Sequence, residues 1–415
     1  MSSAPPASAT PPPARRVNVR TPEVMERVQA QVEEHYRSHL VEGIRASGGM
    51  LTLGNTTVRL ARQFGFCYGV ERAIDLAYAS RKVFAQQRIF LIGEIIHNPE
   101  VNRQLSEMGV VTLQGAEVEE TLATCGPEDV VIVPAFGAVT RIMTLLKERG
   151  VQIVDTTCGD VMSVWKRVKS YAREGFTSII HGKAIHEETR ATASRASGDN
   201  GNGHYLIILT LSDCDFVCDY IRKGGDREAF LARFVGAHSP GFDPDIHLKR
   251  IGVANQTTML KSETEELQLR LAKAIADRDH GASANFLAFD TICGATQERQ
   301  DSLFDLLKKP LDILLVVGGY NSSNTTHLVE IGQEHLPTFF IRDAGCLKEL
   351  DEIIHFDLHQ KAERASYVEK LHTNALLNVG VTAGASCPNN LIEDTILRIF
   401  ALRGLSKQQV LASMS

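Results

Sequence analysis

The 415-residue chain lacks several features that would assign it to a large functional class. No apolar run approaches the roughly 20 residues of a membrane helix, so we expect no membrane partner. The net charge of −6, without a basic stripe interleaved with aromatic residues, argues against nucleic acid. The phosphate-binding pattern G-x-x-x-x-G-K-[ST] is also missing, which argues against a common class of nucleotide-binding enzyme.

Cysteine is sparse, with eight residues and no C-x-x-C pair. This usage excludes a dense disulfide scaffold and the usual zinc spacing, and it suits a reducing compartment such as the cytoplasm. Four of the eight lie in no motif, and we interpret them as buried apolar filler: Cys125, Cys214, Cys218 and Cys346.

Three other cysteines, Cys67, Cys158 and Cys293, each open a copy of the same local design. A short apolar run predicts a strand, a tight turn delivers the cysteine, and an amphipathic helix follows. Free N–H groups at a helix N-terminus favour the thiolate form of a cysteine. Three thiolates from three successive α/β units, meeting at one point, would form a soft site that suits iron–sulfur chemistry and leaves one coordination position open.

Strands and helices alternate from about residue 57 onward, a pattern typical of parallel α/β layers. We therefore predict three pseudo-three-fold related α/β/α units with mainly parallel sheets around a central iron–sulfur site, plus an N-terminal arm. Eleven apolar runs are the expected strands: VRLAR, RIFLIG, DVVIVPAFG, VQIVD, TSIIHG, HYLIILT, IGVAN, FLAFDT, DILLVVGG, PTFFI and ALLNVGVTAG.

The expected boundaries follow from the cysteines and from composition. The first twenty residues are rich in Pro, Ala and Ser and predict a disordered tail, and residues 21–48 predict a helical arm. The full division is 1–56 for the tail and arm, 57–157 for the first unit, 158–292 for the second with its insertions, 293–400 for the third, and 401–415 for a C-terminal tail. Arg72, Arg167 and Arg299, which follow the cysteines, are expected to be solvated helix charges, with pairing to nearby acids as the alternative.

Short polar side chains follow several expected strands, where helix N-termini of open α/β sheets bind anions. His97 follows LIG, the run Ser322–Asn324 follows VVGGYN, and Ser386 lies in GASCP. Such donors, with few lysines, suit a compact phosphate. Ordinary helix capping would explain the run Ser322–Asn324 equally well.

The segment TSIIHGKAIHEETRATAS places His181 and His186 after a strand, with Glu188 two residues further on. A carboxylate beside a histidine and a redox metal can deliver protons. Gln256, Thr257 and Thr258, in VANQTTML, follow another expected strand, where a hydroxyl could orient that carboxylate, but these residues could equally form a β-turn network. The alternative is that the acids only stabilise a helix dipole.

Taken in order, eight motifs resemble the 4-hydroxy-3-methylbut-2-enyl diphosphate reductase family, in its cyanobacterial and plastid branch, over residues 57–400. They are GFCYGVERAI, GEIIHNPEVNRQL, VDTTCGDV, SIIHGKAIHEETRATAS, ANQTTML, DTICGATQERQDS, VVGGYNSSNTTHL and GASCP.

The resemblance implies roles for particular residues. Cys67, Cys158 and Cys293 would hold a [4Fe–4S] cluster with one iron lacking a protein ligand. Glu188 would be the acid of a proton relay, with Thr257 beside it. The residues expected to bind a diphosphate are His97, His186, Ser322, Ser323, Asn324 and Ser386.

The resemblance also implies an activity, the reductive dehydroxylation of (E)-4-hydroxy-3-methylbut-2-enyl diphosphate to isopentenyl and dimethylallyl diphosphates. This is the last step of the non-mevalonate isoprenoid pathway. Two electrons would pass through the cluster, from reduced ferredoxin or flavodoxin. Phe136 stands where many bacterial members have a histidine, so one diphosphate contact is missing or replaced, and Cys387 departs from the family incidentally.

Two other classes of protein stay open at this point. A non-catalytic iron–sulfur scaffold or electron relay would use the cysteines but not the phosphate loops. A nucleotide-binding α/β protein would bury the cysteines as inert core residues.

Overall fold

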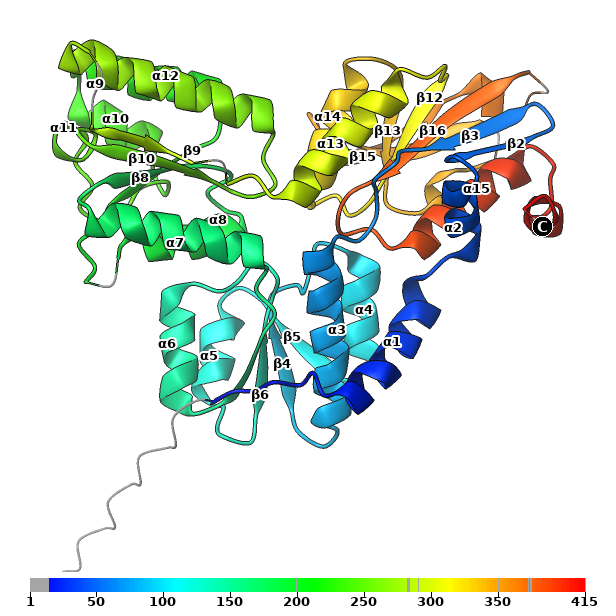
Figure 1. Ribbon diagram of the computed structural model, residues 1–415, viewed down its shortest axis with the longest axis horizontal. Helices are drawn as coiled ribbons and strands as arrows, with labels where there is room; N and C mark the ends of the chain where they lie inside the picture. The colour runs from blue at the N-terminus through cyan, green and yellow to red at the C-terminus, as the bar shows by residue number, and fades with distance from the viewer. Residues whose placement is uncertain are drawn as a thin grey trace, which may run out of the picture.

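The computed structural model describes residues 15–414 apart from residues 199, 282, 283, 290, 350, 372 and 374. It consists of three α/β units whose loops meet at a common centre (Figure 1). Most of the expected disordered tail, residues 1–14, lies outside the described residues.

The first unit contains a five-stranded sheet in which every neighbouring pair of strands is parallel. Its order is β1 (Arg15–Arg16), β7 (Gln152–Asp155), β6 (Val130–Val133), β4 (Ile89–Ile92) and β5 (Val110–Leu113).

The second unit contains a four-stranded parallel sheet. Its order is β11 (Phe286–Ala288), β10 (Ile251–Asn255), β8 (Thr177–His181) and β9 (Tyr205–Ile208).

The third sheet has five strands, of which only β2 runs antiparallel to its neighbour. Its order is β13 (Thr338–Ile341), β12 (Ile313–Val317), β16 (Leu377–Ala383), β3 (Thr56–Leu60) and β2 (Met50–Leu53). A separate antiparallel hairpin joins β14 (Glu352–Asp357) to β15 (Ala362–Tyr367).

One four-strand order recurs in all three sheets. It runs β7-β6-β4-β5 in the first unit, β11-β10-β8-β9 in the second and β3-β16-β12-β13 in the third. In each case the strand that precedes a cysteine loop lies at one end. The recurrence confirms the predicted pseudo-three-fold α/β fold with mainly parallel sheets.

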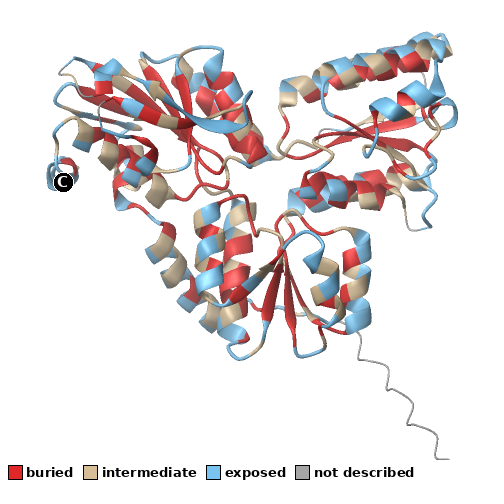
Figure 2. Ribbon diagram, turned by 180° about the vertical axis from the view of Figure 1, so that it is seen from behind, coloured by how far each residue is buried: buried red, intermediate tan, exposed pale blue. Residues whose placement is uncertain are grey.

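Helices cover the faces of the sheets, and Figure 2 shows buried residues along the strands and exposed residues on outer helix faces. The helices are α1 (Pro22–Tyr36), α2 (His39–Ala46), α3 (Tyr68–Val83), α4 (Pro99–Glu107), α5 (Glu117–Ala123), α6 (Thr140–Arg149), α7 (Gly159–Arg173), α8 (Glu187–Ala196), α9 (Leu211–Lys223), α10 (Arg227–Arg233), α11 (Pro244–His247), α12 (Lys261–Asp279), α13 (Gly294–Leu307), α14 (Ser323–Gln333), α15 (Asn389–Leu402) and α16 (Lys407–Ala412), with short 3-10 turns at Ala344–Cys346 and Glu369–Leu371.

The central strands form because their apolar runs are covered on both faces. All residues of β6 and β12 are buried, which matches the near-continuous Val, Ile and Leu content of strands in a parallel sheet. The helices supply the second layer, so each unit has its own core.

The sheets divide the chain differently from the boundaries expected above. Strand β3 pairs with β16, and β2 pairs with β3, so residues 50–60 belong to the third unit rather than to the arm and the first unit. The physical reason is that the strand before each cysteine completes the preceding sheet. Apart from the two-residue β1, the chain therefore forms the first strands of its third sheet, β2 and β3, before the strands of its first sheet, and it completes the third sheet with β16.

The two ends of the chain are also more ordered than the sequence predicted. Residues Arg15–Arg16 extend the first sheet beside β7, and Val19 is fully buried. At the other end, α16 places Val410 in the core of the third unit. Both expected tails therefore contribute buried apolar side chains. Over residues 15–414, apart from the gaps given above, no helix has the length and apolarity to cross a bilayer.

Membership of β3 in the third sheet predicts the effect of a small core substitution. Val58→Ala removes two methyl groups from a fully buried position and should lower the free energy of unfolding by about 2 kcal/mol in urea titrations. Val111→Ala, on a half-exposed edge-strand position, should change it by less than about 0.5 kcal/mol. Equal effects at the two positions would contradict the assigned packing.

Candidate active site

Each of the three motif cysteines is the N-cap residue of a helix, as the sequence predicted. Cys67 precedes α3, Cys158 precedes α7 and Cys293 precedes α13. Each loop runs from the end strand of one sheet to the first helix of the next unit. The cysteines therefore lie at the three crossovers between units, where the loops converge.

A backbone hydrogen bond fixes each cysteine against the loop that follows the neighbouring strand of its own sheet. These bonds run from the N–H of Cys67 to the carbonyl of Ala385 (3.3 Å), from Cys158 to Ala135 (3.0 Å) and from Cys293 to Thr257 (3.2 Å). The same bond is used three times, so the pseudo-symmetry extends to the site itself.

The three thiols line one cavity of about 650 Å³. Two of the sulfurs approach the same glycine, because a Cβ on Gly69 would lie 2.7 Å from Cys158 Sγ and 3.9 Å from Cys67 Sγ. A side chain at position 69 would therefore occupy the space that the sulfurs share. The three motif cysteines thus line one shared cavity, as their predicted convergence requires.

Backbone N–H groups at the helix N-termini favour the thiolates of Cys158 and Cys293, as the sequence predicted, but burial has the larger, opposite effect on both pKa values. Burial raises the pKa of the Cys158 thiol, and it raises that of Cys293 to about 12 despite hydrogen bonds from Thr296. Desolvation outweighs the helix N–H groups, so the thiolates need a nearby cation. Three soft sulfur donors that require a cation fit an iron–sulfur group.

Two of the helix arginines support the cysteine loops instead of facing solvent. Arg299 is buried and donates to the carbonyls of Ala295 and Gly65, two residues before Cys67. Arg72 donates to the carbonyls of residues 156 and 157, directly before Cys158. The expectation of solvated charges was wrong for both, because loop carbonyls near the cavity need donors. Arg167 is exposed as expected, over the ring of Phe289.

The loops after β4, β8 and β12 approach the same cavity from the three units. They end in the N-cap residues Asn98, His186 and Ser322, which occupy equivalent positions before α4, α8 and α14. Helix N-termini carry free N–H groups and a partial positive charge, which attract anions. The cavity brings together all six expected diphosphate-binding residues: His97, His186, Ser322, Ser323, Asn324 and Ser386.

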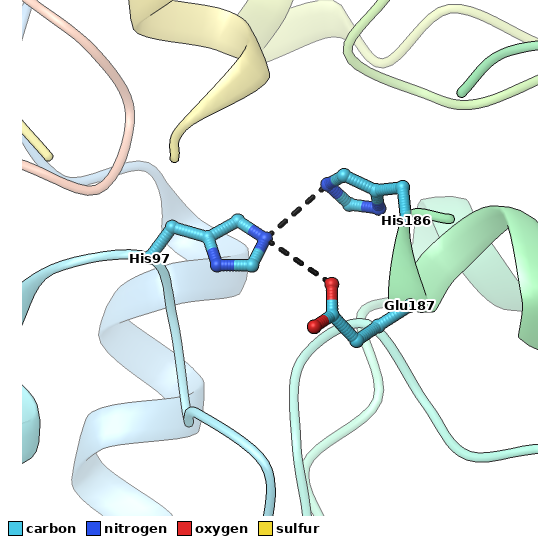
Figure 3. Close-up of side chains that lie close together, drawn as sticks. All are labelled: His97, His186 and Glu187. Atoms are coloured by element: carbon cyan, nitrogen blue, oxygen red, sulfur yellow. Dashed lines mark hydrogen bonds and ion pairs between the residues drawn. The ribbon is translucent and has the colours of Figure 1, made fainter. Parts of the chain in front are cut away.

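Two histidines from different units face each other in this cavity. His97 Nε2 lies 3.2 Å from His186 Nε2, and Figure 3 shows Glu187 beside the pair. Phe136 stacks on the His97 ring at 4.2 Å and meets His186 edge-on. The phenylalanine that the sequence marked as a departure therefore forms a wall that orients both imidazoles.

The serine and asparagine side chains come from the third unit. Ser386 Oγ donates to the carbonyl of His97 (3.1 Å) and lies 3.3 Å from Ser322 Oγ. Asn324 Oδ1 accepts from the N–H of Ala385, whereas its Nδ2 is buried without a partner among the described residues. A buried orphan donor beside hydroxyl groups indicates a site for an anionic oxygen.

Glu188 is buried between the cysteines and the histidines. Its carboxylate accepts from the N–H of Thr257 (2.6 Å) and from Thr257 Oγ1 (3.0 Å), as the sequence predicted for this pair. Burial raises the pKa of Glu188 to about 7, although the two bonds from Thr257 lower it. The group can therefore hold or release a proton near neutral pH.

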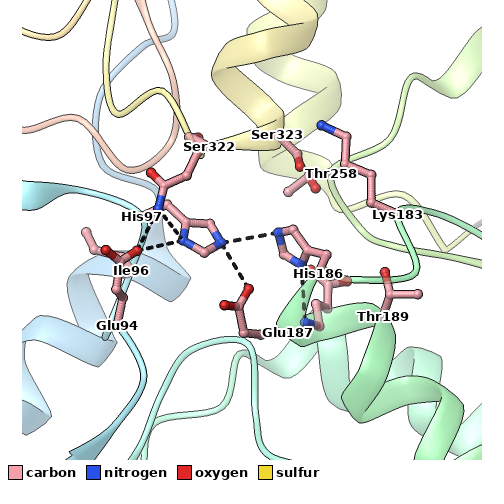
Figure 4. A network of polar contacts seen from close by, with 12 residues as sticks. Glu94, Ile96, His97, Lys183, His186, Glu187, Thr189, Thr258, Ser322 and Ser323 are labelled. Carbon is pink, nitrogen blue, oxygen red and sulfur yellow. Dashed lines mark hydrogen bonds and ion pairs between the residues drawn. The ribbon is translucent and has the colours of Figure 1, made fainter. Parts of the chain in front are cut away.

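Sequence reasoning did not assign Glu94 and Asn321, and it gave Gln256 no definite role. Gln256 Nε2 donates to Thr258 Oγ1 (2.8 Å) and to Ser323 Oγ (3.2 Å), which ties the second unit to the third. Glu94 accepts from Asn321 and contacts His97 (Figure 4). An acid three residues before the motif histidine was the available signal for Glu94.

His181 does not reach the cavity, although it was one of the two histidines in the motif. Its Nδ1 lies 2.8 Å from Thr264 Oγ1, and burial lowers its pKa to about 4, so it is a neutral core residue. The cysteines without a motif are buried, as predicted for filler; they are Cys125, Cys214, Cys218 and Cys346, and Cys387 is buried as well.

The fold and the cavity define an α/β protein with one central site, in which thiols from three units lie opposite anion-binding loops. The LytB protein family matches residues 58–400. The chain belongs to this family.

Curated relatives are similar over nearly the whole chain. The 4-hydroxy-3-methylbut-2-enyl diphosphate reductase of Thermosynechococcus vestitus is 47% identical over 92% of this chain and 93% of its own. The protein of the same name from Gloeobacter violaceus is 47% identical over 94% of this chain and 93% of its own. These cyanobacterial relatives confirm the resemblance read from the motifs.

Solved structures have the same fold. A structure of (E)-4-hydroxy-3-methyl-but-2-enyl diphosphate reductase, described as the terminal enzyme of the non-mevalonate pathway, is 26% identical with a TM-score of 0.51, and covers 83% of this chain and 99% of its own. The Plasmodium falciparum E-1-hydroxy-2-methyl-but-2-enyl-4-diphosphate reductase is 21% identical with a TM-score of 0.59, covering 82% and 86%. The second likeness concerns the fold alone.

The raised pKa of Glu188 predicts a pH-dependent effect of Glu188→Gln on stability. The folded protein holds this proton until about pH 7, whereas the unfolded chain releases it near pH 4.5. The free energy of unfolding of the wild type therefore falls as the pH rises from about 4.5 to about 7. Glutamine does not titrate. The stability of Glu188→Gln relative to wild type should therefore rise by about 2–3 kcal/mol from pH 5 to pH 8 in urea unfolding. A difference independent of pH would contradict the raised pKa.

Proposed function

We propose that this chain catalyses the reductive dehydroxylation of (E)-4-hydroxy-3-methylbut-2-enyl diphosphate to isopentenyl and dimethylallyl diphosphates. The observation that carries the proposal is one cavity that unites three thiols, a buried acid and a set of phosphate-binding donors. The relatives that carry the reductase name span more than nine tenths of the chain, which supports the same assignment.

Cys67, Cys158 and Cys293 are proposed to hold one [4Fe–4S] cluster. Three soft donors around a shared space support this assignment, since a four-iron cluster with three cysteines keeps one iron free of protein ligands. When bound, the cluster would pass two electrons from an external reductant to the substrate and would offer a Lewis-acidic position for the departing hydroxyl group. Gly69 leaves room for the group, because a Cβ there would collide with Cys158 Sγ.

The diphosphate is proposed to lie between the three helix N-termini. Ser322, Ser323, Asn324 and Ser386 would donate from the third unit, with His97 and His186 on the opposite side. Binding energy from a group remote from the reacting carbon positions that carbon and limits its motion. The cavity thereby separates a site that holds the substrate from a site that reduces it.

Glu188 is proposed to donate the proton that accompanies loss of the hydroxyl group. It is the buried acid of the cavity, its pKa is raised to about 7, and Thr257 fixes both of its oxygens. An acid with this pKa is protonated in a useful fraction of molecules at neutral pH and still gives up its proton.

The two other classes are less well supported by this geometry. An iron–sulfur scaffold or relay has no use for the buried orphan donor of Asn324 or for the paired histidines. A nucleotide-binding protein would not need three thiols at one cavity. Reduced ferredoxin or flavodoxin as electron donor, and a cytoplasmic location, stay predictions from the family resemblance and from cysteine usage.

Loss of one sulfur should abolish the cluster. Cys158→Ser is expected to lose the bound iron and sulfide, the brown colour and all turnover, because serine is a poor ligand for this group. The measurement is iron and sulfide content of the anaerobically purified protein. Cys125→Ser, a buried cysteine whose Sγ bonds the carbonyl of Thr121, is the matched control and should keep the cluster. Full activity in Cys158→Ser would refute the ligand assignment.

Glu188→Gln should separate proton delivery from cluster binding. The variant should keep its iron, yet lose turnover by a factor on the order of 10²–10⁴, the usual contribution of a general acid. Wild-type turnover should fall as the pH rises through about 7, because Glu188 is then ionised. Normal turnover in Glu188→Gln, measured anaerobically with the allylic diphosphate, would remove Glu188 from the mechanism.

A further inference from the structure

Glu94 lies directly behind the histidine pair, on the loop between β4 and α4. Its Oε2 is 2.9 Å from His97 Nδ1 and accepts a hydrogen bond from Asn321 Nδ2 (2.8 Å). The Glu94 carboxylate therefore accepts a hydrogen bond from the N–H at His97 Nδ1. The hydrogen bond from Asn321, in the third unit, holds the carboxylate in place. Figure 4 shows this contact on the side of His97 away from His186.

The backbone determines which nitrogen of His186 carries the proton. The N–H of Glu188 donates to His186 Nδ1 at 3.1 Å, so Nδ1 is unprotonated. Burial lowers the pKa of His186 to about 3, which keeps the ring neutral. A neutral imidazole has one N–H, and in His186 this must be Nε2–H.

The two imidazole rings consequently form a hydrogen bond with each other. His186 Nε2–H donates across 3.2 Å to His97 Nε2, which accepts because the His97 proton is on Nδ1, bonded to Glu94. In this state His97 has no donor to offer an anion. It gains one only by taking up a second proton, which the adjacent carboxylate of Glu94 stabilises.

A metal ion is a different possible occupant, because His97, His186 and Glu187 place three ligand atoms within 4.8 Å of one another. A metal at His186 Nε2 would require the ring proton on Nδ1, where the N–H of Glu188 already points. That conflict disfavours a metal and favours an anion, to which Nε2–H can donate.

Charged groups face His97 from several elements. Glu187 on α8 has an oxygen 3.7 Å from His97 Nε2 and is half exposed, so it can turn away when an anion arrives. Glu188 on the same helix and Lys183 in the preceding turn also lie near the pair, and Lys183 opposes a positive charge on His186. Glu94 is the carboxylate fixed on His97 Nδ1.

We propose that Glu94 is a positioning residue: it enables His97 to take up one proton when a diphosphate binds, so that both imidazoles donate from Nε2 to phosphate oxygens. The proton comes from solvent and is placed on His97, while the proton on His186 stays where it is. The inference rests on the proposed function, because it assumes that the anion in this cavity is a diphosphate.

The arrangement also connects recognition to the contact between units. Asn321 reaches Glu94 from the third unit, and the carbonyl of His97 accepts from Ser386 Oγ of the same unit. His186 reaches His97 from the second unit. All three units thus contact one histidine, and its charge state changes upon binding.

The test is isothermal titration of the anaerobic holoenzyme with inorganic pyrophosphate, in buffers of different ionisation heat at pH 6 and pH 8. At pH 8, wild type should take up about one proton more on binding pyrophosphate than His97→Gln does. Taking this difference removes the contribution from the titration of pyrophosphate itself, which is the same for both proteins. Glu94→Gln should bind pyrophosphate about tenfold more weakly than wild type at pH 8. At pH 6 its affinity should be less than about threefold weaker, because the higher proton concentration itself favours protonation of His97.

Glu107→Gln, which removes an exposed carboxylate of the same unit, is the matched control and should bind like wild type at both pH values. Asn321→Ala should give a smaller loss with the same pH dependence, and it tests the inference even if Glu94→Gln does not fold. No excess proton uptake in wild type, or a Glu94→Gln defect equal at both pH values, would overturn the inference and leave the proposed function standing. Absence of pyrophosphate binding in wild type would overturn both.

Discussion

The site depends on one hydrogen bond that the chain makes three times, from the N–H of a cysteine to a carbonyl at the end of the neighbouring strand. This bond holds each cysteine at a crossover between two units, with its helix beginning at the next residue. Because the three crossovers meet at the centre of the molecule, the three thiols are aimed at one space. Arg72 and Arg299 hold the carbonyls just before two of these cysteines and stabilise the same geometry.

Burial then sets the chemistry on both sides of that space. It makes the thiols of Cys158 and Cys293 poor acids, so a cation is needed to hold them as thiolates. It makes Glu188 a weak acid with a pKa of about 7 and keeps His186 neutral. Within one cavity, burial therefore gives thiols that need a cation to ionise, a carboxyl group that can donate a proton near neutral pH, and a neutral histidine that can donate a hydrogen bond.

Much of the fold and the site could be predicted from local sequence patterns. The apolar runs before Cys67, Cys158 and Cys293 correctly predicted the strands β3, β7 and β11. Sheet membership could not be predicted in the same way. That β3 completes the third sheet depends on pairing with β16, more than 300 residues later, which no local pattern records.

The missed site residues have the same explanation. Glu94 and Asn321 are ordinary polar residues of turns, and their function appears only when two units bring them together. The exposure of Arg299 was misjudged because its acceptor, the carbonyl of Gly65, is distant in sequence. Local patterns identify which loops reach the centre, but long-range contacts decide which of their side chains act.

The central claim is that three sulfurs hold a four-iron cluster with one iron free of protein ligands. Mössbauer spectroscopy of the anaerobic, iron-57-labelled protein tests it most directly, because it distinguishes iron sites by their ligands. The account predicts one iron site distinct from the other three, altered when the allylic diphosphate is added. Four equivalent sites, or a two-iron spectrum, would contradict it.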